Sequence, residues 1–193
     1  MNIKQLELNP GTKVPVIVTV DRTLKQPEHG CYVYGNRYNS TYCREVNMGP
    51  AQYDLLRDVE FLVFEPVAGT KTITCQEIFD HYWKLDRSKG GNSEFNSFLG
   101  LEDLREIFKQ RRKLPVKLRK VRIFGWQSLT YFPKTHPNNP GLFVPFMDID
   151  VKDEWVEHRK VMQERFPELD WWPYDCHFWK SETFLSPRFR ARP

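Results

Sequence analysis

Three apolar segments in the first third of the chain predict β-strands. Residues 14–20 form a run of mostly β-branched side chains, and residues 31–34 and 60–65 are shorter apolar runs that end at Gly or Pro. Such runs favour strands because branched and aromatic side chains pack well on a pleated surface. Between the second and third runs, Gly49-Pro50 indicates a short helix over residues 50–57, since proline suits a first helical turn.

Two helices follow with clear start and stop signals. Thr74 and Glu77 have the spacing of a capping box, in which each side chain bonds the backbone amide of the other. Apolar residues then recur at helical spacing through residue 85. Residues 101–108 carry a second apolar stripe with basic residues on the opposite face, and Pro115 ends that helix.

The second half of the chain returns to an extended pattern. Residues 117–124 alternate basic and apolar side chains, residues 128–132 favour a further strand, and residues 142–151 form the strongest late strand. The prolines and asparagines of residues 133–141 indicate a loop. A helix over residues 153–166 follows, and Pro167 stops it.

These elements predict an α+β fold, a single compact domain with a mixed or antiparallel sheet and about four helices. We place this domain at residues 1–168. Residues 169–193 are rich in aromatic and basic side chains and poor in regular patterning, so we expect them to form an extended C-terminal tail.

The composition excludes several classes of protein. Of the 193 residues, 40% are hydrophobic and 28% are charged, which excludes an intrinsically disordered chain. No apolar run approaches the length of about 18 residues that a transmembrane helix needs, and residues 1–7 lack the pattern of a secretory signal. We therefore expect an intracellular, cytoplasmic protein with no membrane partner.

The positive charge lies in the C-terminal half, where residues 101–193 have a net charge of +5 and residues 1–100 a net charge of −1. Between residues 105 and 122, nine cations stand against one acid, Glu106. Basic side chains neutralise phosphates, and exposed aromatic rings such as the one that follows at position 126 stack on bases. The candidate nucleic-acid or partner-binding residues are Arg105, Lys109, Arg111, Arg112, Lys113, Lys117, Arg119, Lys120, Arg122 and Trp126.

The C-terminal tail is a second candidate contact surface. Large aromatic side chains dominate binding hot spots, because they bury much area at low entropic cost; alternatively, these residues fold back over the domain's own core. The candidate partner-binding residues here are Trp171, Trp172, Tyr174, Phe178, Trp179, Arg188 and Arg190. If the tail is an interface, removal of residues 171–193 abolishes association and leaves the fold largely intact.

Asp148 and Asp150 favour a metal-dependent alternative. Residues i and i+2 of a strand face the same side, so two carboxylates stand side by side at the end of an apolar strand. This geometry suits Mg²⁺ or Mn²⁺, which prefer oxygen ligands. The competing interpretation is structural: both carboxylates are solvated at the strand end, and Asp153 caps the next helix.

The order of an Asp-x-Asp strand, a helix and a second strand ending in His177 resembles the core signature of the archaeo-eukaryotic primase-type nucleotidyltransferases. The resemblance covers only residues 143–177, and Asp175 stands where that family usually has Ser. It implies a divalent-metal-dependent nucleotidyltransferase or nuclease in which Asp148 and Asp150 hold Mg²⁺ or Mn²⁺ and His177 lies near a phosphate.

The four cysteines, Cys31, Cys43, Cys75 and Cys176, include no C-x-x-C pair. Structural zinc sites usually take their ligands in closely spaced pairs. A zinc site here needs ligands from distant segments, and our main interpretation therefore includes no metal or other cofactor.

The leading hypothesis is a non-enzymatic interaction protein, a subunit or accessory factor of a larger complex. It predicts contact with nucleic acid or protein through residues 105–122 and through the C-terminal tail. The metal-dependent enzyme is the alternative, and a small antagonist that blocks another enzyme by mimicry fits the sequence as well as the leading hypothesis does.

Overall fold

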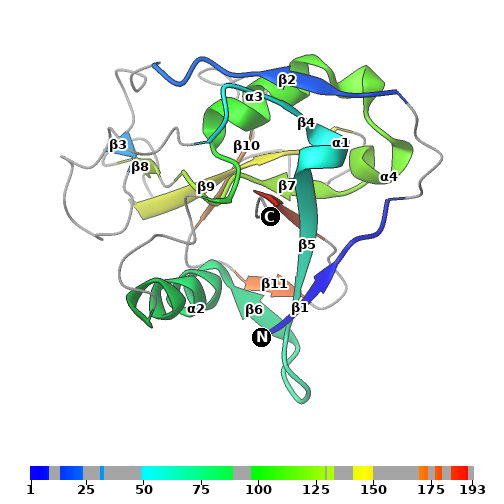
Figure 1. The fold of residues 1–193 in the computed structure, drawn as a ribbon. Coiled ribbons are helices and arrows are strands. Elements are labelled where there is room, and N and C mark those ends of the chain that lie inside the picture. Colours follow the sequence, from blue (N-terminus) through cyan, green and yellow to red (C-terminus); the bar gives the residue numbers. More distant parts are fainter. Residues whose placement is uncertain are drawn as a thin grey trace.

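The fold is α+β, with a mixed sheet and several helices, as the sequence predicts (Figure 1). The computed structural model describes residues 1–8, 14–23, 31–32, 49–88, 97–128, 130–132, 141–149, 170–173, 177–179 and 184–190. None of the helices in these residues is both long enough and apolar enough to cross a membrane.

An eight-stranded sheet forms the centre of the molecule. Its strand order is β1-β5-β12-β7-β9-β8-β3, and β10 also pairs with β9. Its pairs are antiparallel except for β12 and β7, which run parallel. The strands are β1 (Asn2–Gln5), β3 (Cys31–Tyr32), β5 (Val59–Glu65), β7 (Arg122–Phe124), β8 (Thr130–Phe132), β9 (Gly141–Met147), β10 (Asp170–Pro173) and β12 (Phe184–Phe189).

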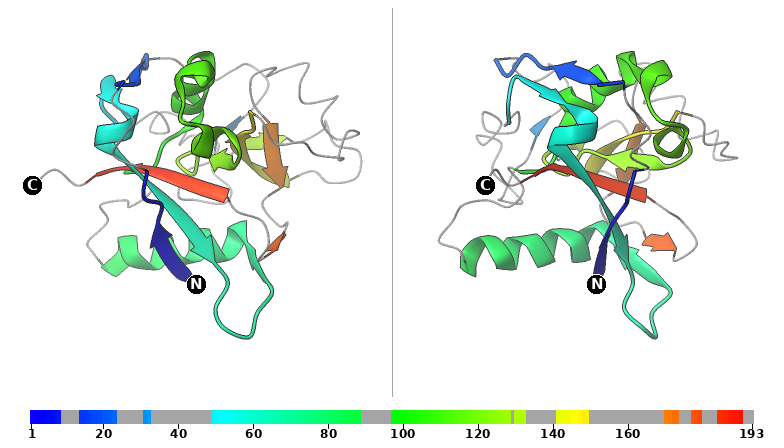
Figure 2. Two further views of the ribbon diagram at one scale, coloured as in Figure 1. Left: turned by 90° about the vertical axis from the view of Figure 1, so that its right-hand side faces the viewer. Right: turned by 45° about the vertical axis from the view of Figure 1, so that its right-hand side comes forward.

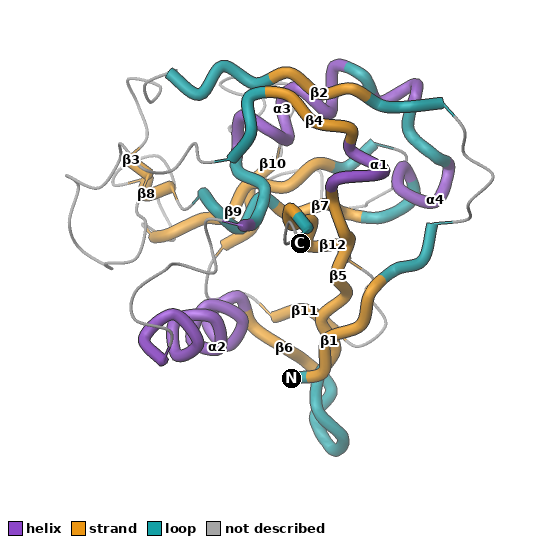
Figure 3. Tube along the Cα trace, in the orientation of Figure 1, coloured by secondary structure: helices purple, strands orange, loops and turns teal. Residues whose placement is uncertain are grey.

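Two short sheets and the helices lie toward the two ends of the molecule. β2 (Ile17–Thr19) pairs with β4 (Gln52–Asp54), and β6 (Thr72–Thr74) pairs with β11 (His177–Trp179). The helices are α1 (Leu55–Asp58), α2 (Cys75–Ser88), α3 (Leu101–Lys109), the 3₁₀ turn η3 (Arg111–Lys113) and α4 (Val116–Arg119). α2 and β6 lie at one end, and α1, α3 and α4 lie at the other end with β2 and β4 (Figure 1, Figure 2 and Figure 3).

The start of α2 confirms the predicted capping box. Thr74 Oγ1 accepts a hydrogen bond from the Glu77 amide at 3.1 Å, and Glu77 Oε2 accepts one from the Thr74 amide at 2.7 Å. Ile78 and Tyr82, one turn apart, are buried in the same cluster as the β6 residue Ile73. The cap fixes where α2 begins, and the apolar stripe fixes which face meets the core.

The short helix after Gly49-Pro50 begins later than the sequence predicts. Residues 52–54 form β4, and only Leu55–Asp58 are helical. The Asp54 carboxylate caps this helix by accepting a hydrogen bond from the Leu56 amide at 3.1 Å. The side-chain acceptor of Asp54, which Pro50 lacks, therefore sets the start.

The predicted extended segment over residues 117–124 is a helix in its first part. Pro115 precedes α4, and its carbonyl accepts a hydrogen bond from the Leu118 amide at 2.9 Å. Only Arg122–Phe124 form a strand, β7. Pro115 therefore ends one helical segment and starts another, and the alternation of the sequence does not separate the two. The predicted helix over residues 153–166 lies outside the described residues.

Aromatic rings carried by β7, β9 and β12, and by Trp126 just after β7, pack together in the core. The Phe124 ring stacks against Trp126 and Phe146, with ring centroids 5.4 and 5.2 Å apart, and meets Phe184 edge-on at 5.4 Å. Trp126 Nε1 donates a hydrogen bond of 2.6 Å to Ser186 Oγ, and both residues are buried. The stack and this hydrogen bond together anchor β12.

β12 places the end of the chain in the middle of the central sheet. Ser186 pairs with Leu62 of β5 on one side, and Leu185 pairs with Ile123 of β7 on the other. Residues 184–189 are extended, as predicted, but they are part of the sheet and not of an appended tail. Removal of residues 171–193 takes out this strand, so we now expect that truncation to disrupt the sheet.

We expect Ser186→Ala to lower the free energy of unfolding by about 1–3 kcal/mol, because it removes the acceptor of a buried Trp126 N–H. Urea unfolding of the purified variant measures the loss. In a Trp126→Phe background the same change should cost clearly less, since the donor is gone. Equal losses in both backgrounds contradict a role for this hydrogen bond.

Candidate functional site

The predicted basic segment is amphipathic along α3, η3 and α4. Leu104, Ile107, Leu114 and Leu118 are buried in one core cluster. Since these residues lie on the side that faces the core, the polar positions between them face outward or along the edge. The apolar face therefore decides which cations of the segment reach solvent.

Five cations of this segment are exposed, and we call them the basic surface. One of them is the last residue of α3, two lie in η3, and the other two lie in α4 and at its C-terminal end. α3 and α4 lie at the same end of the molecule (Figure 1). The basic surface consists of Lys109, Arg112, Lys113, Lys117 and Lys120.

The contacts of these cations with the protein are at the surface. Lys109 Nζ lies 2.6 Å from Glu106 Oε1, and Lys117 Nζ donates to the Glu7 carbonyl at 3.1 Å. An exposed ion pair such as the one between Lys109 and Glu106 contributes about 0–1 kcal/mol. An incoming anion can therefore replace it at little cost.

Arg112 and Lys120 make the fewest contacts with the protein among the cations of the basic surface. Within the described part of the chain, neither makes a hydrogen bond or an ion pair. Lys113 Nζ reaches only Gln110 Oε1, at 3.5 Å. The charge of these three side chains is available to a partner.

The other four cations of the segment are half-buried: Arg105, Arg111, Arg119 and Arg122. Arg105 pairs with Glu102 at 3.3 Å, and the Arg111 guanidinium lies over the Phe108 ring at 4.5 Å from its centroid. Arg119 Nε is buried. These arginines stabilise the segment, so the nine predicted contact cations divide into structural arginines and an exposed, lysine-rich set.

Trp126 is part of the core, which corrects its assignment as a contact residue. Its exposed fraction is 0%, and its ring lies against Phe124. A base cannot stack on a ring that has no exposed face. At this position the aromatic side chain fills the core and is not a contact surface.

A buried carboxylate fixes the start of α3. Asp103 is fully buried, and its oxygens accept hydrogen bonds from the two terminal nitrogens of Arg22 at 2.7 and 2.9 Å. The Tyr53 hydroxyl donates to the same carboxylate at 2.9 Å, and the Gly100 amide donates at 3.0 Å. Each carboxylate oxygen thus accepts two hydrogen bonds, and the opposite charge of Arg22 offsets the cost of burial.

The Tyr53 hydroxyl of this network keeps its proton at physiological pH. Burial raises the pKa of the Tyr53 hydroxyl well above its usual value, and the neighbouring Asp103 charge raises it further. Tyr53 therefore stays a donor at physiological pH. Arg22 also donates to the Pro50 carbonyl at 2.9 Å, so both ends of the guanidinium are held.

The sequence pattern does not identify the residues of this network. The spacing from Gly100 to Asp103 is a helix-start signal, but nothing in the sequence pattern links Asp103 to Arg22, 81 residues away. The network also borders the end of β12. Gly49 has a φ of 127°, where glycine is favoured. The Cβ of any other residue at this position would lie 2.6 Å from the Phe189 ring.

Asp148, a predicted metal ligand, lies beside a cation. Its side chain is 5% exposed, and its Oδ2 is 4.0 Å from Arg122 Nε. His177 begins β11 and pairs with Thr74, in a different sheet from β9, which precedes Asp148. Asp150 lies outside the described residues. Among the side chains that the structure describes, no three His, Cys, Asp or Glu residues gather as a metal site requires.

Four of the five aromatic residues predicted as partner contacts lie on short strands. Trp171 and Trp172 belong to β10, which pairs with β9, and Phe178 and Trp179 belong to β11, which pairs with β6. Tyr174 lies outside the described residues. The segment is thus held by backbone pairing along much of its length.

The two predicted contact arginines of the C-terminus differ in role. Arg188 is half-buried and forms an ion pair and a hydrogen bond with Glu60, which is also its partner in the β5–β12 register. Arg190 is exposed, and its backbone amide donates to the Asp58 carbonyl at 2.9 Å. Arg188 therefore stabilises the sheet, and the side chain of Arg190 is at the surface.

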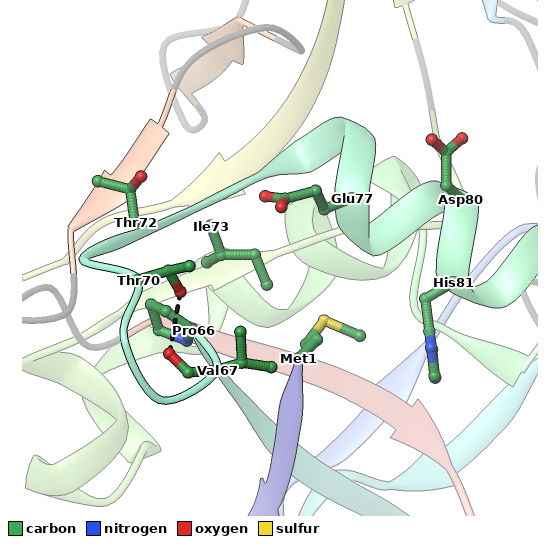
Figure 4. Close-up of a pocket in the computed structure, with 9 residues that line it drawn as sticks. All are labelled: Met1, Pro66, Val67, Thr70, Thr72, Ile73, Glu77, Asp80 and His81. Atoms are coloured by element: carbon green, nitrogen blue, oxygen red, sulfur yellow. Dashed lines mark hydrogen bonds between the residues drawn. The ribbon is translucent and has the colours of Figure 1, made fainter.

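A pocket of about 330 Å³ lies at the opposite end of the molecule from the basic surface. Met1, the turn after β5, Ile73 of β6 and three side chains of α2 line it: Glu77, Asp80 and His81. Figure 4 shows that these three polar ends point in different directions. The carboxylate of Glu77 is engaged in the helix cap. The pocket therefore presents no converging set of polar groups.

No protein-family model, curated protein or solved structure matches this chain. Its function is therefore inferred from the chemistry of its own residues.

We expect Asp103→Asn to lower the free energy of unfolding by about 3–5 kcal/mol, because it leaves the largely buried Arg22 charge without its counterion. The matched control on the same helix is Glu106→Gln, which removes only an exposed pair and should cost about 0–1 kcal/mol. Urea unfolding compares the two variants. A loss for Asp103→Asn no larger than that of the control contradicts the anchoring role of the network.

Glu102 gives the segment a pH-dependent stability. Burial raises the pKa of its carboxyl group, against the lowering effect of Arg105. The folded protein then holds this proton to higher pH than the unfolded chain does, so ionised Glu102 costs stability as pH rises through the raised pKa. Unfolding curves of wild type and Glu102→Gln should show a difference that moves in favour of Gln from about pH 4 to 7. A difference that moves toward wild type over this range contradicts the raised pKa.

Proposed function

We propose that this chain is a non-enzymatic interaction protein, a subunit or accessory factor of a larger complex, that binds a polyanionic partner through its basic surface. The observation that carries the proposal is the exposure of five cations on one short segment, of which Arg112 and Lys120 have no ion pair within the described residues. Exposed cations that lack an ion pair attract an anionic partner and displace its counterions on binding.

The acids of the same segment do not cancel this charge. Asp103 is buried against Arg22, and Glu102 is half-buried beside Arg105. Glu106 is the acid nearest in sequence to the basic surface, and it contacts Lys109. The net charge presented to solvent by residues 101–122 is therefore positive.

The cations are carried on a preorganised support. The buried leucines of the segment pack into the core, and the Asp103 network holds the start of α3. A support that is already ordered loses little backbone entropy on binding. This favours contact by α3, η3 and α4 as a unit.

The proposal also covers the cellular compartment of the protein and the contact residues near its C-terminus. The proposed setting is intracellular, the cytoplasm, where cysteines such as the buried Cys75 are kept reduced. Arg190, exposed after β12, is a proposed contact of a protein partner within the complex. The aromatic residues of β10 and β11 remain proposed contacts as well.

Binding to heparin tests the polyanion proposal. We expect wild type to be retained on immobilised heparin, and Arg112→Gln/Lys120→Gln to elute at clearly lower salt, since two exposed cations are lost from the basic surface. The measurement is the salt concentration at elution, with circular dichroism to establish that each variant is folded.

The matched control is Lys4→Gln/Lys71→Gln. It removes the same charge from exposed positions on β1 and on the turn before β6, at the other end of the molecule (Figure 1). We expect it to elute close to wild type. If both double variants shift equally, net charge and not the basic surface governs retention, and the proposal is wrong.

A further inference from the structure

We infer that the polyanion is a double-helical nucleic acid, bound through its phosphates without readout of the bases. The inference rests on the proposed function and adds the kind of partner. Three properties of the basic surface carry it: the spacing of its cations, the burial of the neighbouring aromatic rings, and its richness in lysine.

The spacing of the cations along the chain is close. Lys109 ends α3, Arg112 and Lys113 lie in η3, and Lys117 and Lys120 lie in α4 and at its C-terminal end. A duplex carries a charge about every 1.7 Å of its axis, so a segment with five exposed cations can contact several phosphates at once.

The burial of the aromatic rings disfavours a single strand. Proteins that bind single strands combine cations with aromatic side chains on which bases stack. Here Phe124 and Trp126 are fully buried, and Phe108 is half-buried under the Arg111 guanidinium. Residues 101–128, all of which the structure describes, offer no exposed aromatic ring. The surface therefore provides charge but no stacking platform.

The composition of the surface disfavours an acidic protein as the partner. Protein interfaces are depleted in lysine and depend on buried aromatic or apolar anchors. Four of the five cations of the basic surface are lysines, and Val116, 52% exposed, is the one exposed large apolar residue between positions 101 and 122. Attraction to phosphates, in contrast, needs no buried aromatic or apolar side chain.

The shape of the segment favours contact with the backbone of the duplex over contact with base edges. Base readout usually places a helix in the major groove and uses bidentate arginine or amide side chains. η3 and α4 span three and four residues, and Arg112 is the one arginine of the basic surface. We therefore expect affinity that does not depend on sequence.

Fluorescence anisotropy with a labelled DNA duplex, an RNA duplex and one isolated strand of each tests the inference. We expect tighter binding to at least one duplex than to its strand at equal salt, and equal affinity for two duplexes of unrelated sequence. With five phosphate contacts, the logarithm of the association constant should fall with the logarithm of salt at a slope of about −4.5.

The variants locate the contact. Arg112→Gln/Lys120→Gln should reduce the steepness of the salt slope by about two units, whereas the control Lys4→Gln/Lys71→Gln should leave it unchanged. Tighter binding to a single strand, a clear preference for one duplex sequence, or tighter binding to polyglutamate than to either duplex overturns the inference. Heparin binding through the basic surface without duplex binding also overturns it and leaves the proposed function standing. Loss of heparin binding as well removes both.

Discussion

The buried carboxylate of Asp103 is the constraint on which the position of the basic surface depends. An ionised group in the interior is tolerated only where opposite charge and hydrogen bonds replace its hydration. Arg22 and Tyr53 supply them from segments distant in sequence, and Gly100 supplies one from the start of α3 itself. If α3 turned or slid by one residue, the carboxylate would leave its donors. The network therefore sets the orientation of α3 and of Lys109 at its end, and the buried Leu114 and Leu118 orient the cations that follow.

Arginine and lysine have different tasks in this protein. Arg22, Arg105, Arg122 and Arg188 each lie beside a carboxylate of the protein. A planar guanidinium suits such fixed pairing, because its donors match a carboxylate. The exposed set is mostly lysine, a compact and well-hydrated charge on a flexible stem. A count of basic residues in a segment therefore overstates the charge available to a partner, and burial distinguishes the two groups.

Local signals in the sequence were sufficient where structure is decided locally. The Thr74–Glu77 box and the apolar spacing after it predict α2, because a cap and a stripe act within a few residues. Local patterns in the sequence do not predict where side chains lie in the tertiary structure. Trp126 follows a basic cluster in sequence, yet its indole bonds Ser186, 60 residues later. The pairing of Asp103 with Arg22 spans 81 residues and leaves no periodicity to detect. The candidate cations were predicted, and their division into exposed and paired groups was not.

The central place of β12 has a consequence for the order of folding. β5 and β7 lie on either side of this strand, and they are made long before it during synthesis. Until β12 is available, both strands present an unpaired edge, which is a template for association with other chains. Closure of the sheet requires contacts between residues far apart in sequence, and such contacts form slowly. The native sheet can therefore close only after β12 has been made, and until then β5 and β7 each keep an edge that favours aggregation.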